Sequence, residues 1–379
     1  MTQPPNYPVL DLQPQIQTHW AEFQSAFQRV LQSGQFILGP EEHAFESECA
    51  TYLGAPHAIG LNSGTDALFI ALRALNIGPG DEVLMPSFTF TSTANSVVLR
   101  GAKPVFLDIR PDTLNLDEKL IEKAITSRTK AILPVHYAGV GCRMDVILSI
   151  AEKHGLLVLE DAAQCILSYY KGRHLGSLGQ MGALSFHETK NIHCGEGGAL
   201  LINDQNLVER AEIIMEKGTN RNKFFRGEVD RYTWTDVGSS FLVNEMTSAF
   251  LWAQLEGAQG ITSMRKEIWR KYHEELSSLE KEGLLKRPVL EDQNPGNAHI
   301  YFILLKDAAT RDELISFLKK RDIMAVFHYI PLHSAPFSGS NETLKETDSI
   351  SGRLLRLPLF IGVDCDEVVR SLRDFFKGS

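Results

Sequence analysis

The fold is decided by one stretch, which reads Ser185-Phe186-His187-Glu188-Thr189-Lys190-Asn191 and closes with Gly195-Glu196-Gly197-Gly198. Strand-like apolar runs flank it at 183–186 and 199–202, so Lys190 is predicted to lie in a loop directly after a strand. A lysine amine there can form a Schiff base with an aldehyde cofactor and later carry a proton. The alternative is an ordinary solvated lysine. The glycine spacing matches neither a Walker A loop nor a GxGxxG fingerprint.

Outward from this loop, short apolar strands alternate with helical segments. The predicted strands are 58–61, 82–85, 104–107, 131–135, 156–159, 183–186 and 199–202, and the predicted helices are 16–35, 65–75, 90–100, 117–126, 143–154, 205–217 and 244–256. This alternation is typical of a mostly parallel sheet that helices cover on both faces. Residues 1–256 are therefore predicted to form a large α/β domain that includes an amphipathic N-terminal helix.

The order of predicted helices and strands changes beyond Gly257. A long charged helix at 263–282 leads to a strand at 299–305, a helix at 310–320, a strand at 323–330 and a closing helix at 366–376. This pattern predicts a smaller α+β domain over residues 257–379.

Two further polar sites precede the lysine loop. Asn62-Ser63-Gly64-Thr65 stands at a strand-to-helix junction, where free backbone N–H groups and the helix dipole favour an anion. Asp161 follows the strand at 156–159, at the edge where ligands of open α/β sheets bind, and its carboxylate can hold a pyridinium N–H. Each site has a plain structural alternative, an N-cap. Together with Lys190 they predict a phosphate cradle, a ring-nitrogen carboxylate and a Schiff-base lysine for one cofactor.

Several motifs resemble the DegT/DnrJ/EryC1/StrS family of sugar aminotransferases. They are Gly39, Ser63-Gly64-Thr65-Asp66-Ala67-Leu68, Gly80-Asp81-Glu82-Val83, Asp161-Ala162-Ala163-Gln164, Thr189-Lys190-Asn191 and Gly195-Glu196-Gly197-Gly198. The similarity covers nearly the whole chain. It implies the fold-type I, aspartate-aminotransferase-like architecture and pyridoxal 5'-phosphate as cofactor. It also implies a homodimer in which both subunits contribute to each active site.

The same resemblance implies a role for each matching residue. Lys190 corresponds to the Schiff-base lysine, Asp161 to the partner of the pyridine nitrogen, Gln164 to the residue beside the ring hydroxyl and Phe88 to the aromatic that stacks on the ring. Gly64, Thr65 and Ser185 correspond to the phosphate contacts, and His187 to the position beside the lysine. One segment departs from the family pattern: Gly238-Ser239-Ser240-Phe241 offers Ser240 where many relatives have an asparagine that reaches the neighbouring subunit's phosphate.

A narrower resemblance comes from the second half of the chain. Residues 217–221, 224–227, 232–234 and 324–333 look like the family members of enterobacterial common antigen synthesis that act on TDP-4-keto-6-deoxy-D-glucose. That resemblance implies L-glutamate as amino donor and TDP-4-amino-4,6-dideoxy-D-galactose as product. The five cations Lys217, Arg221, Lys223, Arg226 and Arg231 are candidates for the pyrophosphate, with a solvated loop as the alternative. His328, Tyr329 and His333 are candidate sugar or phosphate contacts, with buried structural roles as the alternative.

Other activities remain open at this level. They are a sibling transaminase that acts at C3 or gives the gluco epimer at C4, and a cofactor-binding regulatory protein without turnover. A sugar dehydratase is disfavoured because the dehydratases that resemble this family lack the lysine.

Composition narrows the expected partners and the expected location of the protein. A formal net charge of −9 argues against general nucleic-acid binding. No apolar run is long enough for a membrane span, the N-terminus lacks a signal peptide, and five scattered cysteines fit a reducing cytoplasm. The sequence also predicts no metal site, because no ligands are grouped at a metal-binding spacing.

Overall fold

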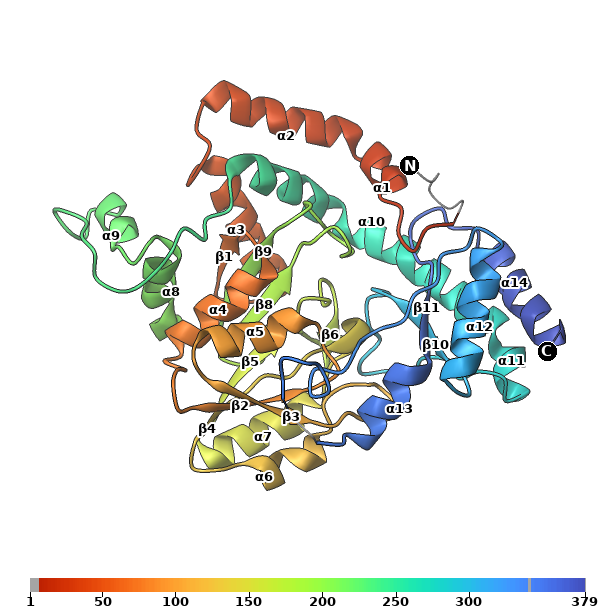
Figure 1. Ribbon diagram of the computed structural model, residues 1–379. Helices are drawn as coiled ribbons and strands as arrows, with labels where there is room; N and C mark the ends of the chain where they lie inside the picture. Colours follow the sequence, from red (N-terminus) through yellow and green to blue (C-terminus); the bar gives the residue numbers. More distant parts are fainter. Residues whose placement is uncertain (1–6, 340–341, 379) are drawn as a thin grey trace.

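The computed structural model describes residues 7–339 and 342–378. Its centre is a seven-stranded sheet in the order β1-β9-β8-β5-β4-β2-β3 (Figure 1). The strands are β1 (His57–Leu61), β2 (Glu82–Pro86), β3 (Lys103–Leu107), β4 (Thr129–Ile132), β5 (Leu157–Asp161), β8 (Met181–Ser185) and β9 (Gly198–Ile202). Only β9 runs against the other strands of this sheet, so the predicted mostly parallel α/β architecture is confirmed.

Helices cover both faces of the sheet. On one face lie α4 (Gly64–Ala74), α5 (Thr91–Leu99) and α8 (Val208–Met215), and on the other lie α3 (Pro40–Leu53), α7 (Met144–His154) and α10 (Glu245–Glu275). Strand β8 shows how the chain sorts its side chains between the two layers. Met181 and Ala183 join the α4 core, whereas Leu184 joins the α3 core, because successive strand side chains point to opposite faces.

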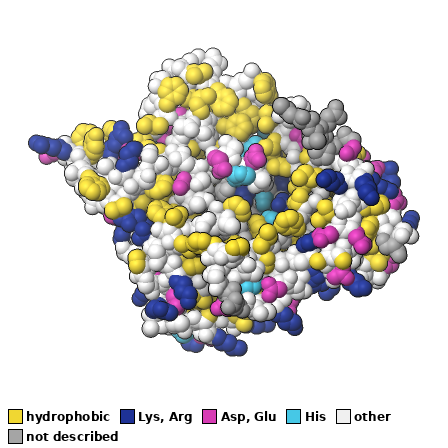
Figure 2. Space-filling model, viewed as in Figure 1, with side chains coloured by type: hydrophobic (Ala, Val, Ile, Leu, Met, Phe, Trp, Pro, Cys, Tyr) yellow, Lys and Arg dark blue, Asp and Glu magenta, His cyan; other side chains and the backbone are white. Residues whose placement is uncertain are grey.

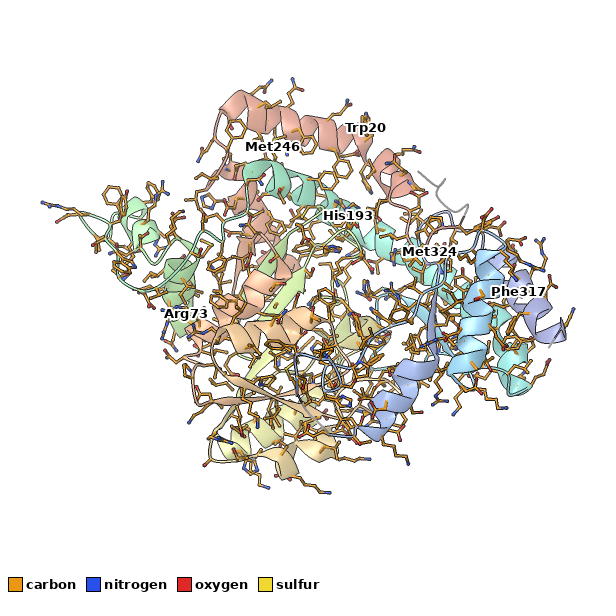
Figure 3. The ribbon with its side chains drawn as sticks, in the orientation of Figure 1. Trp20, Arg73, His193, Met246, Phe317 and Met324 are labelled. Carbon is orange, nitrogen blue, oxygen red and sulfur yellow. The ribbon has the colours of Figure 1, made fainter. Side chains whose placement is uncertain are left out.

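The predicted N-terminal helix at 16–35 is two helices, α1 (Gln13–Thr18) and α2 (Trp20–Ser33), which meet at His19. Phe23 and Val30 bury the inner face of α2 against the start of α10. Trp20 is 56% exposed although its spacing fits an apolar helix face. Figure 3 labels Trp20 on α2, the helix that packs beside α10.

The predicted helices at 244–256 and 263–282 are wrong in their division. Helix α10 runs without a break from Asn244, whose side chain caps it by accepting from the Thr247 N–H. Gly257 lies inside it, where an added Cβ would lie 2.5 Å from the His19 ring. This glycine therefore serves close packing and is not a helix breaker. The predicted boundary at residue 257 falls within α10, and the division into two domains stays a prediction.

The C-terminal part has a core of its own. It gathers the end of α10, the two-stranded sheet β10 (Tyr301–Leu304) with β11 (Leu354–Leu357), and the helices α12 (Ala308–Lys319) and α14 (Cys365–Gly378). Phe317 of α12 makes an edge-to-face ring contact with Phe375 of α14, and Figure 3 shows Phe317 in this helical layer. The end of the chain therefore forms a helical layer over a small sheet, beside the large sheet (Figure 1).

The predicted strand at 323–330 is not the second strand of that sheet. The segment alternates in burial, with Ile323 and Ala325 inside and Met324 outside. It pairs only through single bridges, one of which joins Val326 to Arg356. Strand β11 takes the place beside β10, and its four residues, which directly follow a helix, gave no separate signal in the sequence.

Short elements complete the fold. They are η1 (Glu118–Leu120), α6 (Ile121–Ala124), η2 (Tyr137–Gly139), the hairpin β6 (Tyr169–Tyr170) with β7 (Arg173–His174), η3 (Gln205–Leu207), α9 (Arg221–Phe225), α11 (Ser277–Lys281) and α13 (Lys345–Arg353). Within residues 7–339 and 342–378, no helix is both long and apolar enough to cross a membrane.

Candidate active site

The ends of β5 and β8 and the start of α4 meet at one edge of the sheet. Because β5 and β8 are parallel neighbours, their last residues, Asp161 and Ser185, lie at the same edge. A Cβ added at Gly64, the first residue of α4, would lie 2.9 Å from the Cβ of Ser185. A Cβ at Gly198 would lie 2.3 Å from the Ser63 carbonyl carbon. Both glycines are therefore required for the backbones to approach.

The start of α4 has the features of an anion site. The Ser63 side chain caps the helix by accepting from the Asp66 N–H at 3.1 Å. The first N–H groups of a helix have no partner within the helix, so those of Gly64 and Thr65 are available to a ligand. The Thr65 hydroxyl lies 2.9 Å from the Ser92 hydroxyl of α5. With Ser185 beside Gly64, three hydroxyls surround this helix end, and Ser92 is a member that the sequence did not single out.

Asp161 is a buried carboxylate with two donors. Thr93 Oγ1 donates to its Oδ2 at 2.8 Å, and the Ala163 N–H donates to its Oδ1 at 3.2 Å. Burial raises the pKa of Asp161, while these donors and the nearby positive charge of Lys190 oppose the rise. A cationic ring N–H is the kind of partner that would stabilise the ionised form further.

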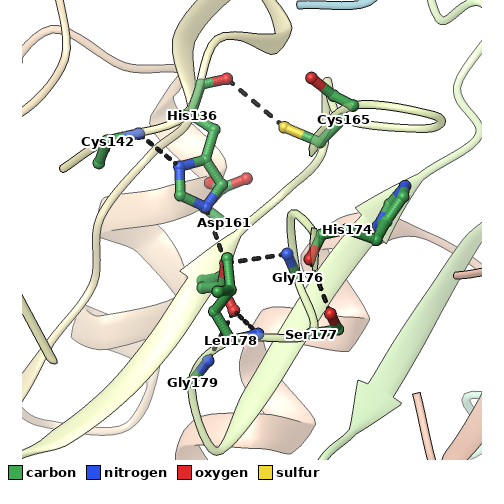
Figure 4. Close-up of polar contacts among 12 residues, drawn as sticks. His136, Cys142, Asp161, Cys165, His174, Gly176, Ser177, Leu178 and Gly179 are labelled. Carbon is green, nitrogen blue, oxygen red and sulfur yellow. Dashed lines mark hydrogen bonds and ion pairs between the residues drawn. The ribbon is translucent and has the colours of Figure 1, made fainter. Parts of the chain in front are cut away.

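The neighbouring residue Glu160 anchors the loop that contains Gly176, Leu178 and Gly179, which Figure 4 labels together with His136. Its carboxylate accepts from the backbone N–H groups of Gly176, Leu178 and Gly179 at 2.7–2.9 Å and from His136 Nε2 at 3.0 Å. His136 Nδ1 accepts from a backbone N–H, so the ring proton lies on Nε2. Burial would raise the pKa of Glu160, but these donors outweigh it and lower the pKa. These hydrogen bonds of Glu160 thus hold in place the backbone that carries Asp161.

Lys190 lies in a tight turn after β8. Its backbone N–H donates to the His187 carbonyl at 2.9 Å. Burial lowers the pKa of the Lys190 amine to about 8, the charge of Asp161 opposes this, and the charge of Arg356 lowers the pKa further. An amine with this pKa has a substantial neutral fraction at neutral pH, which is the form that attacks an aldehyde.

The next residue ties the lysine turn to the C-terminal part of the chain. Asn191 Nδ2 donates to the Asn297 carbonyl at 2.9 Å, and its Oδ1 lies 3.1 Å from His299 Nδ1. Because an amide oxygen only accepts, His299 Nδ1 carries the proton. Burial and then the charges of Lys190 and Arg356 keep the pKa of His299 well below its usual value. These bonds of Asn191 anchor the turn that carries Lys190 to residues 297–299.

Gln164 and His328 each contact one tyrosine beside Asp161 and Lys190. Its Oε1 accepts from the Ala138 N–H at 2.7 Å, which fixes the orientation of the amide, and its Nε2 donates to the Tyr329 hydroxyl at 3.2 Å. His328 Nδ1 lies 3.1 Å from the Tyr137 hydroxyl. Gln164, His328 and Tyr329, singled out from the sequence, thus meet in one cluster, and Tyr137 is an addition.

The assignment of Phe88 as the stacking aromatic is corrected by burial. Phe88 is 1% exposed and packs against Tyr137 and Tyr329, so it has no free ring face. Phe90, two positions later, is 60% exposed and lies 6.5 Å from Tyr329 between ring centroids. Phe90 is therefore the aromatic available to a planar ring. Both side chains fit the motif in the sequence, and only the packing distinguishes them.

The five cations of 217–231 lie elsewhere. In Figure 1 α9 projects from the side of the molecule beside α8, away from the ends of β5 and β8. Lys217 and Arg221 pair with Glu216, and Arg226 pairs with Glu212 and Glu228. Lys223 pairs with Glu209. Within one copy of the chain, these cations are not brought to Lys190.

The remaining predicted positions are peripheral to this cluster. His187 is partly exposed, and its ring contacts the Thr189 hydroxyl at 3.0 Å. Ser240 is exposed and forms a backbone bridge with Glu216. His333 is buried, where its Nδ1 lies 2.7 Å from the Ser87 hydroxyl, which is a structural role.

These donor groups fit pyridoxal 5'-phosphate. The aldehyde requires an amine that is partly neutral at neutral pH, the ring nitrogen requires a carboxylate, and the phosphate requires a helix start with hydroxyls. Lys190, Asp161 and the Gly64–Thr65 turn supply them at one edge of one sheet. The fold and this chemistry define the class of pyridoxal-phosphate-dependent aminotransferases.

Comparison with known proteins places the chain within that class. The model of the DegT/DnrJ/EryC1/StrS aminotransferase family matches residues 17–373. The spore coat polysaccharide biosynthesis protein SpsC of Bacillus subtilis is 37% identical over 364 residues, which cover 92% of this chain and 93% of that protein. The dTDP-3-amino-3,4,6-trideoxy-alpha-D-glucose transaminase of Streptomyces venezuelae is 37% identical over 361 residues, covering 94% and 91%.

A solved structure agrees with these matches. The crystal structure of S. venezuelae DesV in complex with a ketimine intermediate has a TM-score of 0.89 and 34% identity, and the match covers 98% of this chain and 99% of that chain. This chain belongs to the DegT/DnrJ/EryC1/StrS aminotransferase family, and pyridoxal 5'-phosphate is its cofactor.

Proposed function

We propose that this protein transfers an amino group from L-glutamate to C4 of TDP-4-keto-6-deoxy-D-glucose, which gives TDP-4-amino-4,6-dideoxy-D-galactose and 2-oxoglutarate. The observation that carries the amino-transfer part is the shielded Lys190 amine, with its pKa near 8, beside the buried Asp161 carboxylate. The sugar part is supported by the resemblance of residues 217–234 and 324–333. A 37% identical relative is named for the transaminase of a TDP-linked 3-amino sugar, which supports a TDP-linked sugar as the substrate class.

The chain's own residues have distinct tasks in this reaction. Bound pyridoxal 5'-phosphate supplies the aldehyde and an electron-withdrawing ring. Lys190 Nζ accepts the proton from Cα of the amino donor and later delivers a proton to C4 of the sugar. Asp161 holds the proton on the ring nitrogen, and Phe90 covers one ring face. General acid–base assistance of this kind typically contributes about 10²–10⁴-fold.

In our proposal, a homodimer brings the cations of residues 217–231 to the active site of the neighbouring copy. Residues 217–240 of each copy lie, in our proposal, against the site of the other copy, so Ser240 and Arg226 act across the interface. The exposed aromatics of this segment support this placement, because Phe225, Tyr232 and Trp234 all lie at the surface of the single chain. Aromatic side chains and arginine are enriched at protein interfaces.

The substrate is tested by a panel of keto-sugar nucleotides offered to enzyme pre-loaded with the amino group from L-glutamate. Consumption of TDP-4-keto-6-deoxy-D-glucose and an axial C4 amine in the product NMR spectrum are expected. An equatorial C4 amine, or reaction only with a 3-keto sugar, would assign one of the sibling activities instead. A protein that binds the cofactor but never accepts the amino group of glutamate would be a regulatory member of the family.

A further inference from the structure

A cavity of about 270 Å³ lies where the C-terminal half of α10 meets the large sheet. Residues 288–298, which lead into β10, contribute one side of it, and the loops after β3 and β4 contribute another. Most of the lining is apolar and includes Trp269, Ile300 and Phe302, whereas Lys190 and Asp161 do not line it. A ligand held there would therefore touch both parts of the chain without entering the candidate active site.

Two basic side chains line the same cavity. Lys266 and Arg270 stand four positions apart on α10, so they are neighbours on one face of that helix. Arg270 Nε donates to the Lys266 carbonyl at 3.3 Å, but over residues 7–339 and 342–378 neither side chain forms an ion pair with Asp or Glu. Burial lowers the pKa of Lys266, and the charge of Arg270 lowers it further. Like charges at this spacing are destabilising, and an anion between them would remove that cost.

The cavity wall does not neutralise these two cations. Among the described residues that line it, only Asp112 carries a carboxylate, and that carboxylate accepts from Arg110 Nε at 2.9 Å, from Arg110 NH2 at 2.6 Å and from the Thr113 N–H at 2.7 Å. On the face shown in Figure 2, basic and acidic side chains are interspersed over the C-terminal part of the molecule. On α10 itself, Lys271 pairs with Asp366 at 2.8 Å. The cavity thus keeps a positive charge that its own residues leave uncompensated.

We propose that this cavity binds a small organic anion with a flat apolar body, whose anionic group lies between Lys266 and Arg270. Ligand pockets are typically apolar with a few polar groups that fix orientation, and their volumes are about 300–1,000 Å³. A volume just below that range suits a body of one or two rings and not a nucleotide sugar. The Trp269 ring, which stacks on His273 with 4.7 Å between centroids, supplies an aromatic wall for such a body. The inference does not depend on the proposed function.

The test measures binding of two probes to the cofactor-loaded protein by calorimetry. 2-Naphthoate carries a carboxylate on a two-ring body, and 2-naphthylmethanol has the same body without the charge. The double variant Lys266→Gln with Arg270→Gln removes the two cations, and Lys281→Gln with Lys320→Gln removes two exposed cations elsewhere as the matched control. Val289→Trp narrows the cavity from an exposed position and leaves its cations in place. Circular dichroism checks that each variant is folded.

The parent protein should bind 2-naphthoate about tenfold more tightly than 2-naphthylmethanol, the order expected for charge-assisted hydrogen bonds. Loss of Lys266 and Arg270 should abolish this preference and leave the affinity for the alcohol unchanged, whereas Val289→Trp should weaken binding of both probes. The control pair of substitutions should behave as the parent protein. Equal affinity of the parent protein for the two probes would overturn the proposal. So would 2-naphthoate binding that neither cavity variant changes, because the probe would then bind elsewhere on the molecule.

Discussion

At the scale of single residues, the active lysine depends on its surroundings more than on its own chemistry. Burial removes water from the Lys190 amine and lowers its pKa to about 8, and Asp161 prevents a larger drop. A free lysine would be almost fully protonated at neutral pH. The same burial raises the pKa of Asp161, so each group counteracts the effect of burial on the other.

This environment predicts how the cofactor-free protein takes up pyridoxal 5'-phosphate at different pH values. The neutral amine is the nucleophile, so the rate of attachment should rise about tenfold per pH unit below pH 8 and level off above it. The growth of the visible absorbance band after mixing measures this rate. A rate that keeps rising up to pH 10 would show that Lys190 has an ordinary pKa.

The aromatic next to the ring gives a second prediction. Phe90→Ala should weaken cofactor binding by about threefold to tenfold, because an aromatic contact contributes about 0.5–1.5 kcal/mol. Phe88→Ala removes a buried ring and should lower the free energy of unfolding by about 3–5 kcal/mol. Titration with the cofactor and urea denaturation separate the two effects. Equal cofactor affinity in Phe90→Ala and the parent protein would contradict this assignment.

The motifs singled out polar residues that the structure brings to one edge of the sheet, and packing distinguishes the aromatic side chains between which the motifs do not decide. Lys190, Asp161 and Gly64 each stand at a junction between a strand and the segment after it, and such junctions are visible in the sequence. Phe88 and Phe90 are equally plausible there, because only their burial differs.

At the scale of elements, the sheet positions the site because its strands are parallel. The carboxyl ends of β5 and β8 place Asp161 and the lysine turn at one edge, and α4 adds the anion site there. The strands of the large sheet were predictable from short apolar runs. In the small sheet, β10 was predicted at 299–305, whereas β11 was not, because β11 is brief and the alternating segment 323–330 resembles a strand more closely.

The two glycines within α10 give a matched pair of predictions. Gly260→Ala adds a Cβ into open space and should raise the free energy of unfolding by up to about 1 kcal/mol through helix propensity. Gly257→Ala places its Cβ 2.5 Å from the His19 ring, so it should gain less or lose stability as α1 and α2 shift. Urea denaturation of the two variants measures the difference. A larger gain for Gly257→Ala would show that the contact with His19 does not form.

At the scale of the whole molecule, our proposal requires a second copy of the chain to complete the substrate side of the site. Lys217, Arg221, Lys223 and Arg226 pair with carboxylates that lie mostly in or directly after α8, on a part of the chain that projects away from the ends of β5 and β8 (Figure 1). Trp234 in the same region is 77% exposed. The sequence predicted a shared site through resemblance alone, because no periodicity or composition encodes which surface meets a second copy.

A shared site predicts complementation between two inactive variants. Lys190→Ala removes the amine, and Ser240→Asp sets a negative charge against the neighbouring copy's cofactor phosphate, so each should be inactive alone. Co-expression should restore activity, because a mixed dimer holds one site with both Lys190 and Ser240. Ser239→Asp, which changes the adjacent hydroxyl, should remain active and serves as the control. No recovery in the mixed dimer would contradict a site built from two copies.

The most direct measurement is the absorbance spectrum of the purified, cofactor-loaded protein before and after addition of L-glutamate. We predict a band near the visible edge that moves toward the ultraviolet as the amino group is taken up. Lys190→Ala should lose this response, and the exposed Lys153→Ala should keep it. A spectrum of the parent protein that stays featureless with pyridoxal 5'-phosphate, or that ignores glutamate, would contradict the assignment of Lys190 and with it the proposed aminotransferase activity.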